Sequence, residues 1–543
     1  TALLRAIVPP ATRDRLRRFV DRRLMNPYAY SFDLYRRARA STYGSHVAGL
    51  EVPGEAGLVS VVLPVYNGGS MISEAIESVL RQTHRRLELI IIDDGSTDDT
   101  PVILEEYGRR DSRVRVIRQE NQKLPRALSR GFREARGEFL TWTSSDNHLK
   151  PDCLEKMLGS LSRHPCWDMV YANIDLIGEQ SEYLQGASHY EGYQRPHGSA
   201  HVHLPTSTLE LNVWPNNSIG AAFMYRARVA ALIGDYSSAR FVSEDYDYWM
   251  RVNGLLTLRH VDFEEPIYDY RFHAHSLTSR WAELRMLENR DRLMVFEEFR
   301  RDFYLSPMVW IIEGDDAETA PLRHEVRARG HLLYDGGYAL TDLPRLFVPV
   351  VYVHVGRATA AGSEPRGELP AQALKVLVTA DQPLPNEAAR TWDLCCALGA
   401  RKGLPHLERP YQGWLAATDA ATLVHAIDIR AKSEALARIE ADTDMPRREL
   451  CAASVVVCTH RFGPRVMSTL HSVLRQQFDR PYELLLVNNA PARVDLSETV
   501  ARLRAELPID HPVRLRLVVC PIVGLSAARN APVGDPKFGI FRM

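Results

Sequence analysis

Several short polar segments of this chain carry the residue types that could do chemistry. Asp146 follows the apolar run 138–143 and stands beside two serines, while Glu244 and Asp245 open a helical pattern and His273 lies in the segment Tyr-Arg-Phe-His. Carboxylate and hydroxyl oxygens suit a hard divalent cation, and imidazole suits Mn²⁺ better than Mg²⁺. A positioned carboxylate can also take the proton from a hydroxyl group, which is otherwise a poor nucleophile.

Each of these features also has a simpler structural interpretation. Asp146 can be a turn residue that caps the following helix. Glu244 and Asp245 can simply stabilise the positive end of a helix dipole. Glu244 and Asp247 are the alternative proton acceptors, although Asp247 can instead face solvent. His275 is the alternative to His273.

Strands and helices alternate from residue 58 onwards, and they must position these polar segments. Apolar runs predict four strands, at 58–65, 87–92, 114–117 and 138–143. Between them, one helix is expected after Ser70 as its N-cap, a second with Thr100 as N-cap and Pro101 in the first turn, and a third over 127–135. This alternation predicts a parallel sheet with helices on both faces. Its loops gather at the carboxyl edge, where open α/β sheets bind their ligands.

The bulk composition limits the class of protein. The chain has 543 residues, 25% of them charged, and a formal net charge of -1. Its length predicts three or four domains at about 100–200 residues each. The charge balance argues against a general nucleic-acid binder, which would need a basic excess. The longest apolar run, 346–355, is far short of the roughly 20 residues of a membrane helix. No signal peptide opens the chain, and seven cysteines without framework spacing indicate a reducing cytosol.

The first 55 residues are locally basic. Arginines alternate with apolar residues there: Arg13, Arg15, Arg17, Arg18, Arg22 and Arg23. One interpretation is a solvated helix that packs on the next domain. The alternative is a peripheral contact with an anionic membrane surface.

Four motifs in the right order resemble family 2 glycosyltransferases. They are Ser60-Val-Val-Leu-Pro-Val-Tyr-Asn67, Ser78-Val-Leu-Arg-Gln-Thr83, Glu88-Leu-Ile-Ile-Ile-Asp-Asp-Gly-Ser-Thr-Asp98 and Gly137-Glu-Phe-Leu140. The resemblance covers about residues 58 to 280. It implies a GT-A fold, which is an α/β fold with a doubly wound, mostly parallel sheet. It also implies a nucleoside-diphosphate sugar as donor, a divalent metal (Mn²⁺ or Mg²⁺), and inversion at the anomeric carbon.

The resemblance also implies roles for particular residues. Asp245 matches the catalytic base, and Asp146 and His273 match positions that hold the metal or the diphosphate. The family's metal-binding Asp-x-Asp has Ser144 at its first position here, and the arginine of its Ala-Arg-Asn-x-Gly motif is missing. The expected nucleotide-sugar-binding residues are Pro64, Tyr66, Asp94, Lys123, Arg126 and Ser145.

The resemblance and the composition together predict five segments. A basic helical segment (1–55) precedes the GT-A domain (56–280), a connecting helix (281–305) and a second α/β region (306–450), in which 415–439 is expected to be helical and 360–370 a linker. The motifs Ser454-Val-Val-Val-Cys-Thr-His-Arg461 and Glu483-Leu-Leu-Leu-Val-Asn-Asn489 repeat the first copy. They predict an incomplete second GT-A-like domain at 451–543, holding only the nucleotide-binding half.

The resulting hypothesis is a cytoplasmic, possibly membrane-associated, metal-dependent hexosyltransferase-like enzyme of bacterial surface polysaccharide or glycan synthesis. Its donor would be a nucleoside-diphosphate sugar, a UDP-sugar first of all, and its acceptor a glycan or a lipid-linked glycan. The alternative is a sugar-nucleotide-binding or scaffold module without catalysis, suggested by Ser144 and by the unfinished second copy. A nucleotidyltransferase is disfavoured because no Gly-rich loop for a triphosphate is present.

Overall fold

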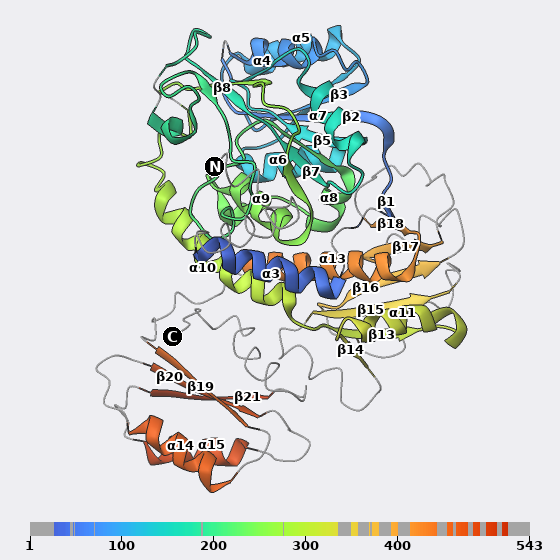
Figure 1. Ribbon diagram of the computed structural model, residues 1–543, viewed down its shortest axis with the longest axis vertical. Helices are drawn as coiled ribbons and strands as arrows, with labels where there is room; N and C mark the ends of the chain where they lie inside the picture. The colour runs from blue at the N-terminus through green and yellow to red at the C-terminus, as the bar shows by residue number, and fades with distance from the viewer. Residues whose placement is uncertain are drawn as a thin grey trace, which may run out of the picture. The chain divides into compact units, whose positions relative to one another are not determined.

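The computed structural model describes residues 27–43, 47, 49–69, 71–185, 188–274, 276–334, 349–356, 369, 372–379, 392–399, 413–441, 453–459, 463–475, 482–488, 496–507 and 513–519. These residues form two compact units. The first unit contains the described residues up to 47 and from 53 to 297, and the second contains 49–52 and those from 298 onwards (Figure 1).

A seven-stranded sheet forms the centre of the first unit, in the order β11-β7-β10-β5-β2-β3-β4. Its strands are β2 (Glu55–Val65), β3 (Leu87–Asp93), β4 (Val114–Arg118), β5 (Gly137–Trp142), β7 (Met169–Tyr171), β10 (Phe223–Arg226) and β11 (Leu258–His260). Strands β2 to β5 run parallel, whereas β10 runs antiparallel to both β5 and β7. The predicted α/β fold with a mostly parallel sheet is confirmed, and all four predicted strands are present.

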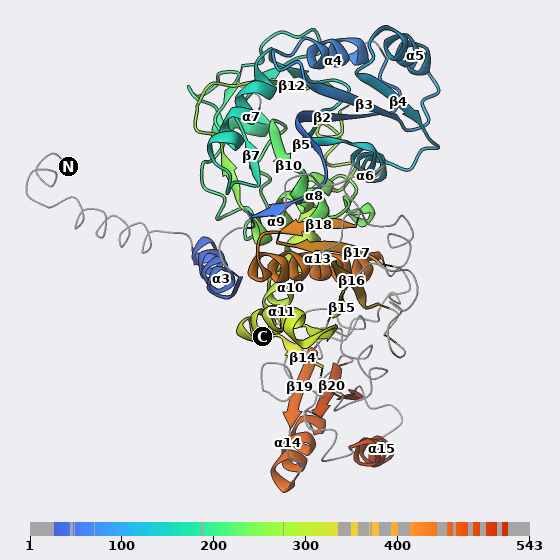
Figure 2. The ribbon, with the colours of Figure 1, turned by 90° about the vertical axis from the view of Figure 1, so that its right-hand side faces the viewer.

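Helices on both faces bury this sheet, which explains why its strands read as unbroken apolar runs. Figure 2 shows α4 (Met71–Leu80) and α5 (Thr100–Arg110) on one face of β2, β3 and β4, with α6 (Leu124–Glu134) on the other. The buried face of α4 consists of Ile72, Ala75, Ile76, Val79 and Leu80.

Helix α6 approaches the sheet unusually closely at Gly131. A Cβ atom at this position would lie 2.3 Å from Val62 Cγ1 and 3.3 Å from Ile92 Cγ1. Only glycine fits so close to β2 and β3, since any larger side chain would force the helix away from the sheet. This close packing fixes the position of the N-terminal end of α6, where Lys123 is the N-cap, relative to the carboxyl edge of the sheet.

A four-stranded sheet in the order β6-β12-β8-β9 completes the first unit. It consists of β6 (His148–Leu149), β8 (Ile174–Ile177), β9 (His201–Val202) and β12 (Tyr268–Arg271). The remaining helices that begin in this unit are α3 (Pro27–Tyr43), α7 (Cys153–Arg163), η1 (Ser188–Tyr193), α8 (Ala227–Ile233), η2 (Ser238–Arg240), α9 (Glu244–Leu255) and α10 (Met286–Leu305).

The second unit has its own seven-stranded sheet, in the order β1-β18-β17-β16-β15-β13-β14. Its strands are β1 (Leu50–Glu51), β13 (Val309–Glu313), β14 (Leu332–Leu333), β15 (Val350–Val355), β16 (Leu374–Thr379), β17 (Leu394–Leu398) and β18 (Trp414–Ala417). All neighbours run parallel except β1, which is antiparallel to β18. Its helices are α11 (Asp316–Ala328) and α13 (Ala420–Ala441).

A separate three-stranded parallel sheet, β19-β20-β21, contains the repeated motifs. Its elements are β19 (Ala453–Thr459), α14 (Pro464–Leu474), β20 (Tyr482–Asn488), α15 (Ser497–Glu506) and β21 (Val513–Val519). Ser454 lies opposite Glu483, as Ser60 lies opposite Glu88 in the first unit. The repeated motifs thus share the strand order and register of β2, β3 and β4.

Two predictions about local structure are wrong. Thr100 is the first residue of α5 rather than its N-cap, which is Asp99, and its Oγ1 instead accepts a hydrogen bond from Gly68 N at 2.9 Å. Residues 414–417 form the buried strand β18 rather than the start of a helix. Ser70, the arginine-rich stretch and, apart from residue 369, the expected linker lie outside the described residues.

No helix in the described ranges combines the length and the apolar character that a bilayer crossing requires.

Candidate functional site

The ends of β2 and β3 place the expected nucleotide-binding residues at one edge of the sheet. Asp94 follows β3 directly and is 4% exposed, and its backbone N–H donates to Val65 O at 2.8 Å. Its Oδ1 accepts hydrogen bonds from Gln119 Nε2 at 2.7 Å and from Gln122 N at 2.9 Å. Oδ2 has no partner among the described residues, so this oxygen can accept an N–H from a ligand.

The other residues expected to bind the nucleotide sugar lie before and after Asp94 in the sequence. Pro64 is within β2, and Tyr66, just after β2, is 53% exposed and can offer its ring to a base. Lys123 and Arg126 are both exposed at the beginning of α6, where cations and free backbone N–H groups favour phosphate. Gln119 and Gln122 were missed by the sequence reasoning, because no motif marks the segment between β4 and α6.

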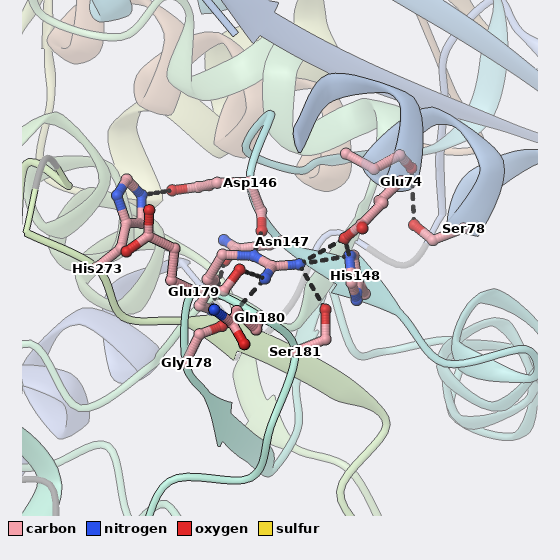
Figure 3. A network of polar contacts seen from close by, with 12 residues as sticks. Glu74, Ser78, Asp146, Asn147, His148, Gly178, Glu179, Gln180, Ser181 and His273 are labelled. Atoms are coloured by element: carbon pink, nitrogen blue, oxygen red, sulfur yellow. Dashed lines mark hydrogen bonds and ion pairs between the residues drawn. The ribbon is translucent and has the colours of Figure 1, made fainter. Parts of the chain in front are cut away.

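Asp146 and His273 meet at the carboxyl edge of β5 (Figure 3). His273 Nε2 lies 3.0 Å from Asp146 Oδ2, although the two residues are 127 positions apart in the chain. Asp146 Oδ1 is buried and has no hydrogen-bond partner in the described part of the chain. Ser145 lies beside Asp146 and is partly exposed. His275, the alternative to His273, lies outside the described residues.

This pair fits a divalent cation that a substrate would help to hold. Over the described ranges, no group of three or more His, Cys, Asp or Glu side chains is placed to bind a metal. Mg²⁺ and Mn²⁺ at such sites commonly take one or two protein ligands and fill the remaining positions with water and substrate phosphates. The unpaired, buried oxygen of Asp146 is consistent with that arrangement.

Asp245, the expected catalytic base, lies in the first turn of α9. Its Oδ2 accepts a hydrogen bond from Asn217 Nδ2 at 3.0 Å, and its Oδ1 accepts one from Tyr246 N at 2.6 Å. Burial raises the pKa of Asp245, and the charge of Arg290 on α10 lowers it in part. A raised pKa makes this carboxylate a stronger proton acceptor than an ordinary aspartate. Neither Asn217 nor Arg290 had been predicted, since both act across the fold.

The acidic neighbours of Asp245 have different environments. Glu244 is 4% exposed, and its Oε2 has no partner among the described residues. Burial raises the pKa of Glu244, and the charge of Asp245 raises it further. Asp247 is fully buried and pairs with Arg251 Nε at 2.9 Å, so the expectation that it can face solvent is wrong. The ion pair also makes Asp247 a poor candidate for the proton acceptor.

Tyr270 is influenced by both Asp146 and Asp245. Burial raises the pKa of its phenol, and the negative charges of Asp146 and Asp245 raise it further. Its hydroxyl group is hydrogen-bonded to Thr278 Oγ1 at 2.7 Å, and its ring packs edge-on against that of Tyr190 at 6.1 Å. The two carboxylates therefore act on the same aromatic side chain.

Glu244→Gln is expected to stabilise the protein at high pH. Because the folded-state pKa of Glu244 is raised, its favourable contribution is complete below the unfolded-state pKa of about 4.3 and is lost as the pH rises through the folded-state pKa. The neutral amide avoids this loss. We expect a Tm about 2–4 °C above that of the wild type at pH 9, the shift that roughly 1 kcal/mol causes in a domain of this size.

The difference in Tm should shrink at pH 5, where the carboxyl group of Glu244 is protonated in the folded wild type. Glu106→Gln is the matched control, because Glu106 is exposed and pairs with Arg110 at 3.6 Å on the surface of α5. A shift in Tm that is the same at both pH values would contradict the effect of burial.

Comparisons with known proteins identify the family of this chain. The family model described as Glycosyl transferase family 2 matches residues 60–232. An uncharacterized glycosyltransferase of Rickettsia felis is 29% identical over 224 residues, which cover 40% of this chain and 34% of that protein. One from Haemophilus influenzae is 30% identical over 224 residues, which cover 41% of this chain and 68% of that protein. The chain thus spans only about a third of the rickettsial relative.

Among solved structures, S. aureus TarS 1-349 in complex with UDP matches with 19% identity and a TM-score of 0.33, over 45% of this chain and 68% of that one. A similarity of this size supports no inference about mechanism. The family match and the Haemophilus relative are sufficient for assignment, and this chain belongs to the family 2 glycosyltransferases.

Proposed function

We propose that this protein is an inverting glycosyltransferase that moves a sugar from a nucleoside-diphosphate sugar to a hydroxyl group of a glycan or lipid-linked acceptor. The observation that carries the proposal is the pairing of Asp146 with His273 at 3.0 Å, together with the buried carboxylate of Asp245, which Asn217 holds by a hydrogen bond at 3.0 Å. A donor-side carboxylate and an acceptor-side carboxylate are the two groups that a single in-line displacement needs.

In this reaction Asp245 takes the proton from the acceptor hydroxyl group. The acceptor oxygen attacks the anomeric carbon from the side opposite the diphosphate, and the bond between that carbon and the diphosphate breaks. Asn217 holds the carboxylate in place through its hydrogen bond to Oδ2. A Mn²⁺ or Mg²⁺ ion, held by Asp146 and His273, would offset the charge on the diphosphate when bound.

We propose a UDP-sugar as the donor. The free Oδ2 of Asp94 supports this choice, because an ionised carboxylate only accepts hydrogen bonds and uracil offers one N–H at its ring. Guanine also offers such an N–H, so GDP-sugars belong in the same test. Lys123 and Arg126 at the start of α6 are placed to contact the phosphates.

The test is release of nucleoside diphosphate from a panel of UDP-, GDP- and dTDP-sugars, with Mn²⁺, Mg²⁺ or EDTA. Turnover of one donor that depends on the metal would support the transferase. Tight binding of a sugar nucleotide without turnover on any acceptor or on water would instead favour the non-catalytic binding module.

We also propose that the sheet β19-β20-β21 belongs to the nucleotide-binding half of a second copy. Support comes from the shared register, with Thr459 opposite Asn488 where the first unit has Val65 opposite Asp93. In the sequence, Asn489 takes the place of Asp94, so the second copy lacks the carboxylate that we propose to contact the base, and we expect calorimetry to give one UDP per chain. A second site of similar affinity would show that this copy also binds nucleotide.

A further inference from the structure

Arg271 is the last residue of β12, and the topology puts it between two loops. Strand β12 lies between β6 and β8 in the smaller sheet. Because β6 runs antiparallel to β12 and β8 runs parallel, the start of β6 and the end of β8 both lie at the end of β12. The loop 146–148 leads into β6, and the turn 178–181 follows β8.

The guanidinium of Arg271 joins these two loops. Its Nε donates to Asp146 O at 2.7 Å. Its Nη1 donates to Gly178 O at 3.0 Å and to Glu179 O at 2.6 Å. Its Nη2 donates to Ser181 Oγ at 3.0 Å (Figure 3). The side chain is only 1% exposed, so these bonds form away from water.

The same guanidinium also reaches a third segment, helix α4. Its Nη2 lies 2.8 Å from Glu74 Oε2 and 2.8 Å from His148 Nε2, and these two atoms lie 3.0 Å from each other. Arginine is the residue type that can do this, because its planar group presents five N–H donors in a fixed fork, whereas lysine presents three from one point.

Arg271 and His273 therefore hold the same residue by different atoms. Arg271 binds the main-chain oxygen of Asp146, and His273, two residues later, contacts its carboxylate at 3.0 Å. The backbone N–H of Arg271 also donates to Asn147 Oδ1 at 2.8 Å. Any shift of the guanidinium would move the Asp146 loop relative to His273.

We propose that Arg271 is a positioning residue, which locks the loop 146–148 and the turn 178–181 into one arrangement and so sets where the Asp146 carboxylate stands. This inference rests on the proposed function, since it assigns Asp146 to the donor side. It adds that the turn 178–181, which the family motifs leave out, moves together with Asp146.

The test compares Arg271→Lys with a matched buried arginine. Arg228, in α8, is 7% exposed, and it donates to Asp168 Oδ1 at 2.6 Å and to Pro165 O at 2.8 Å, away from the proposed site. Both lysine variants keep the charge and lose the fork. We expect kcat to fall about 10²-fold in Arg271→Lys only, the usual cost of a misplacement of about 1 Å. Arg228→Lys should lower Tm and leave kcat unchanged.

Hydrogen exchange of the protein without metal or nucleotide gives a second measurement, independent of catalysis. Arg271→Lys should speed exchange in 146–148 and in 178–181 together, whereas Arg228→Lys should leave both segments unchanged. If Arg271→Lys does not fold, Glu74→Gln replaces it, because Glu74 is half-exposed on α4. That variant should speed exchange in the same two segments and lower kcat about tenfold, the value of one charge-assisted hydrogen bond.

The outcomes separate this inference from the proposed function. If the wild type releases no nucleoside diphosphate from any donor, the proposed function fails, but the exchange measurement still tests the coupling of the two loops. If the wild type is active and Arg271→Lys only lowers Tm, as Arg228→Lys does, the positioning role is overturned. Faster exchange in one loop without the other would overturn it as well.

Discussion

Asp245→Asn is expected to lower kcat for sugar transfer by about 10²–10⁴-fold, the usual contribution of a general base. The amide keeps the size of the side chain and can still accept the hydrogen bond from Asn217, but it cannot take a proton. Affinity for UDP should not change, since we propose that Asp245 contacts the acceptor and not the nucleotide. Release of nucleoside diphosphate gives kcat, and calorimetry with UDP gives the affinity.

Glu244→Gln is the control for this experiment, because it removes the adjacent buried carboxylate and leaves Asp245 in place. We expect Glu244→Gln to retain most of the activity. Wild-type activity in Asp245→Asn would exclude Asp245 as the base. A loss in Glu244→Gln alone would move that role to Glu244.

Asp146→Asn is expected to weaken metal-dependent binding of UDP by at least about 10²-fold. Substitution of residues that only hydrogen-bond to metal ligands already lowers metal affinity by about 10–100-fold, and a direct ligand should matter more. The physical reason is that Asp146 supplies the only carboxylate of the expected metal motif, with Ser144 at the other position. The measurement is calorimetry with UDP in Mn²⁺ and in EDTA. Binding in EDTA, for which we propose Asp94 as a contact, should be the same in both proteins.

Ser144→Asp provides the opposite change, since it rebuilds the carboxylate pair of the family motif. This variant should lower the Mn²⁺ concentration needed for half-maximal binding of UDP. If Asp146→Asn binds UDP with the same dependence on Mn²⁺ as the wild type, Asp146 does not hold the metal.

The sequence was sufficient for the core of the first unit. Strands β2 and β3 are buried on both faces, and their apolar runs could be recognised without knowing what covers them. The same rule failed at residues 414–417, because a short buried strand followed at once by a long helix has the composition of that helix. Asp247 was misjudged for a related reason: its partner Arg251 lies one helical turn away, and burial of the pair comes from the surrounding fold.

The site could be predicted only where a motif marks a single residue. Asp146, Asp245 and His273 could be named in advance, but their supporting partners could not. Asn217 and Arg271 make their contacts across 28 and 125 positions of the chain, respectively, and no local pattern encodes such pairs. Supporting contacts of this kind depend on which loops the two sheets bring together.

The close contact at Gly131 connects the core of the protein to the surroundings of Asp94, which we propose to contact the nucleotide base. Helix α6 touches β2 without room for one extra methyl group, and Gln122, just before this helix, donates its N–H to the carboxylate of Asp94. The packing at Gly131 therefore determines where the start of the helix lies relative to the carboxylate of Asp94. If the proposed function holds, substitution of Val62 or Gly131 will alter nucleotide preference without any change in a residue that is expected to touch the nucleotide.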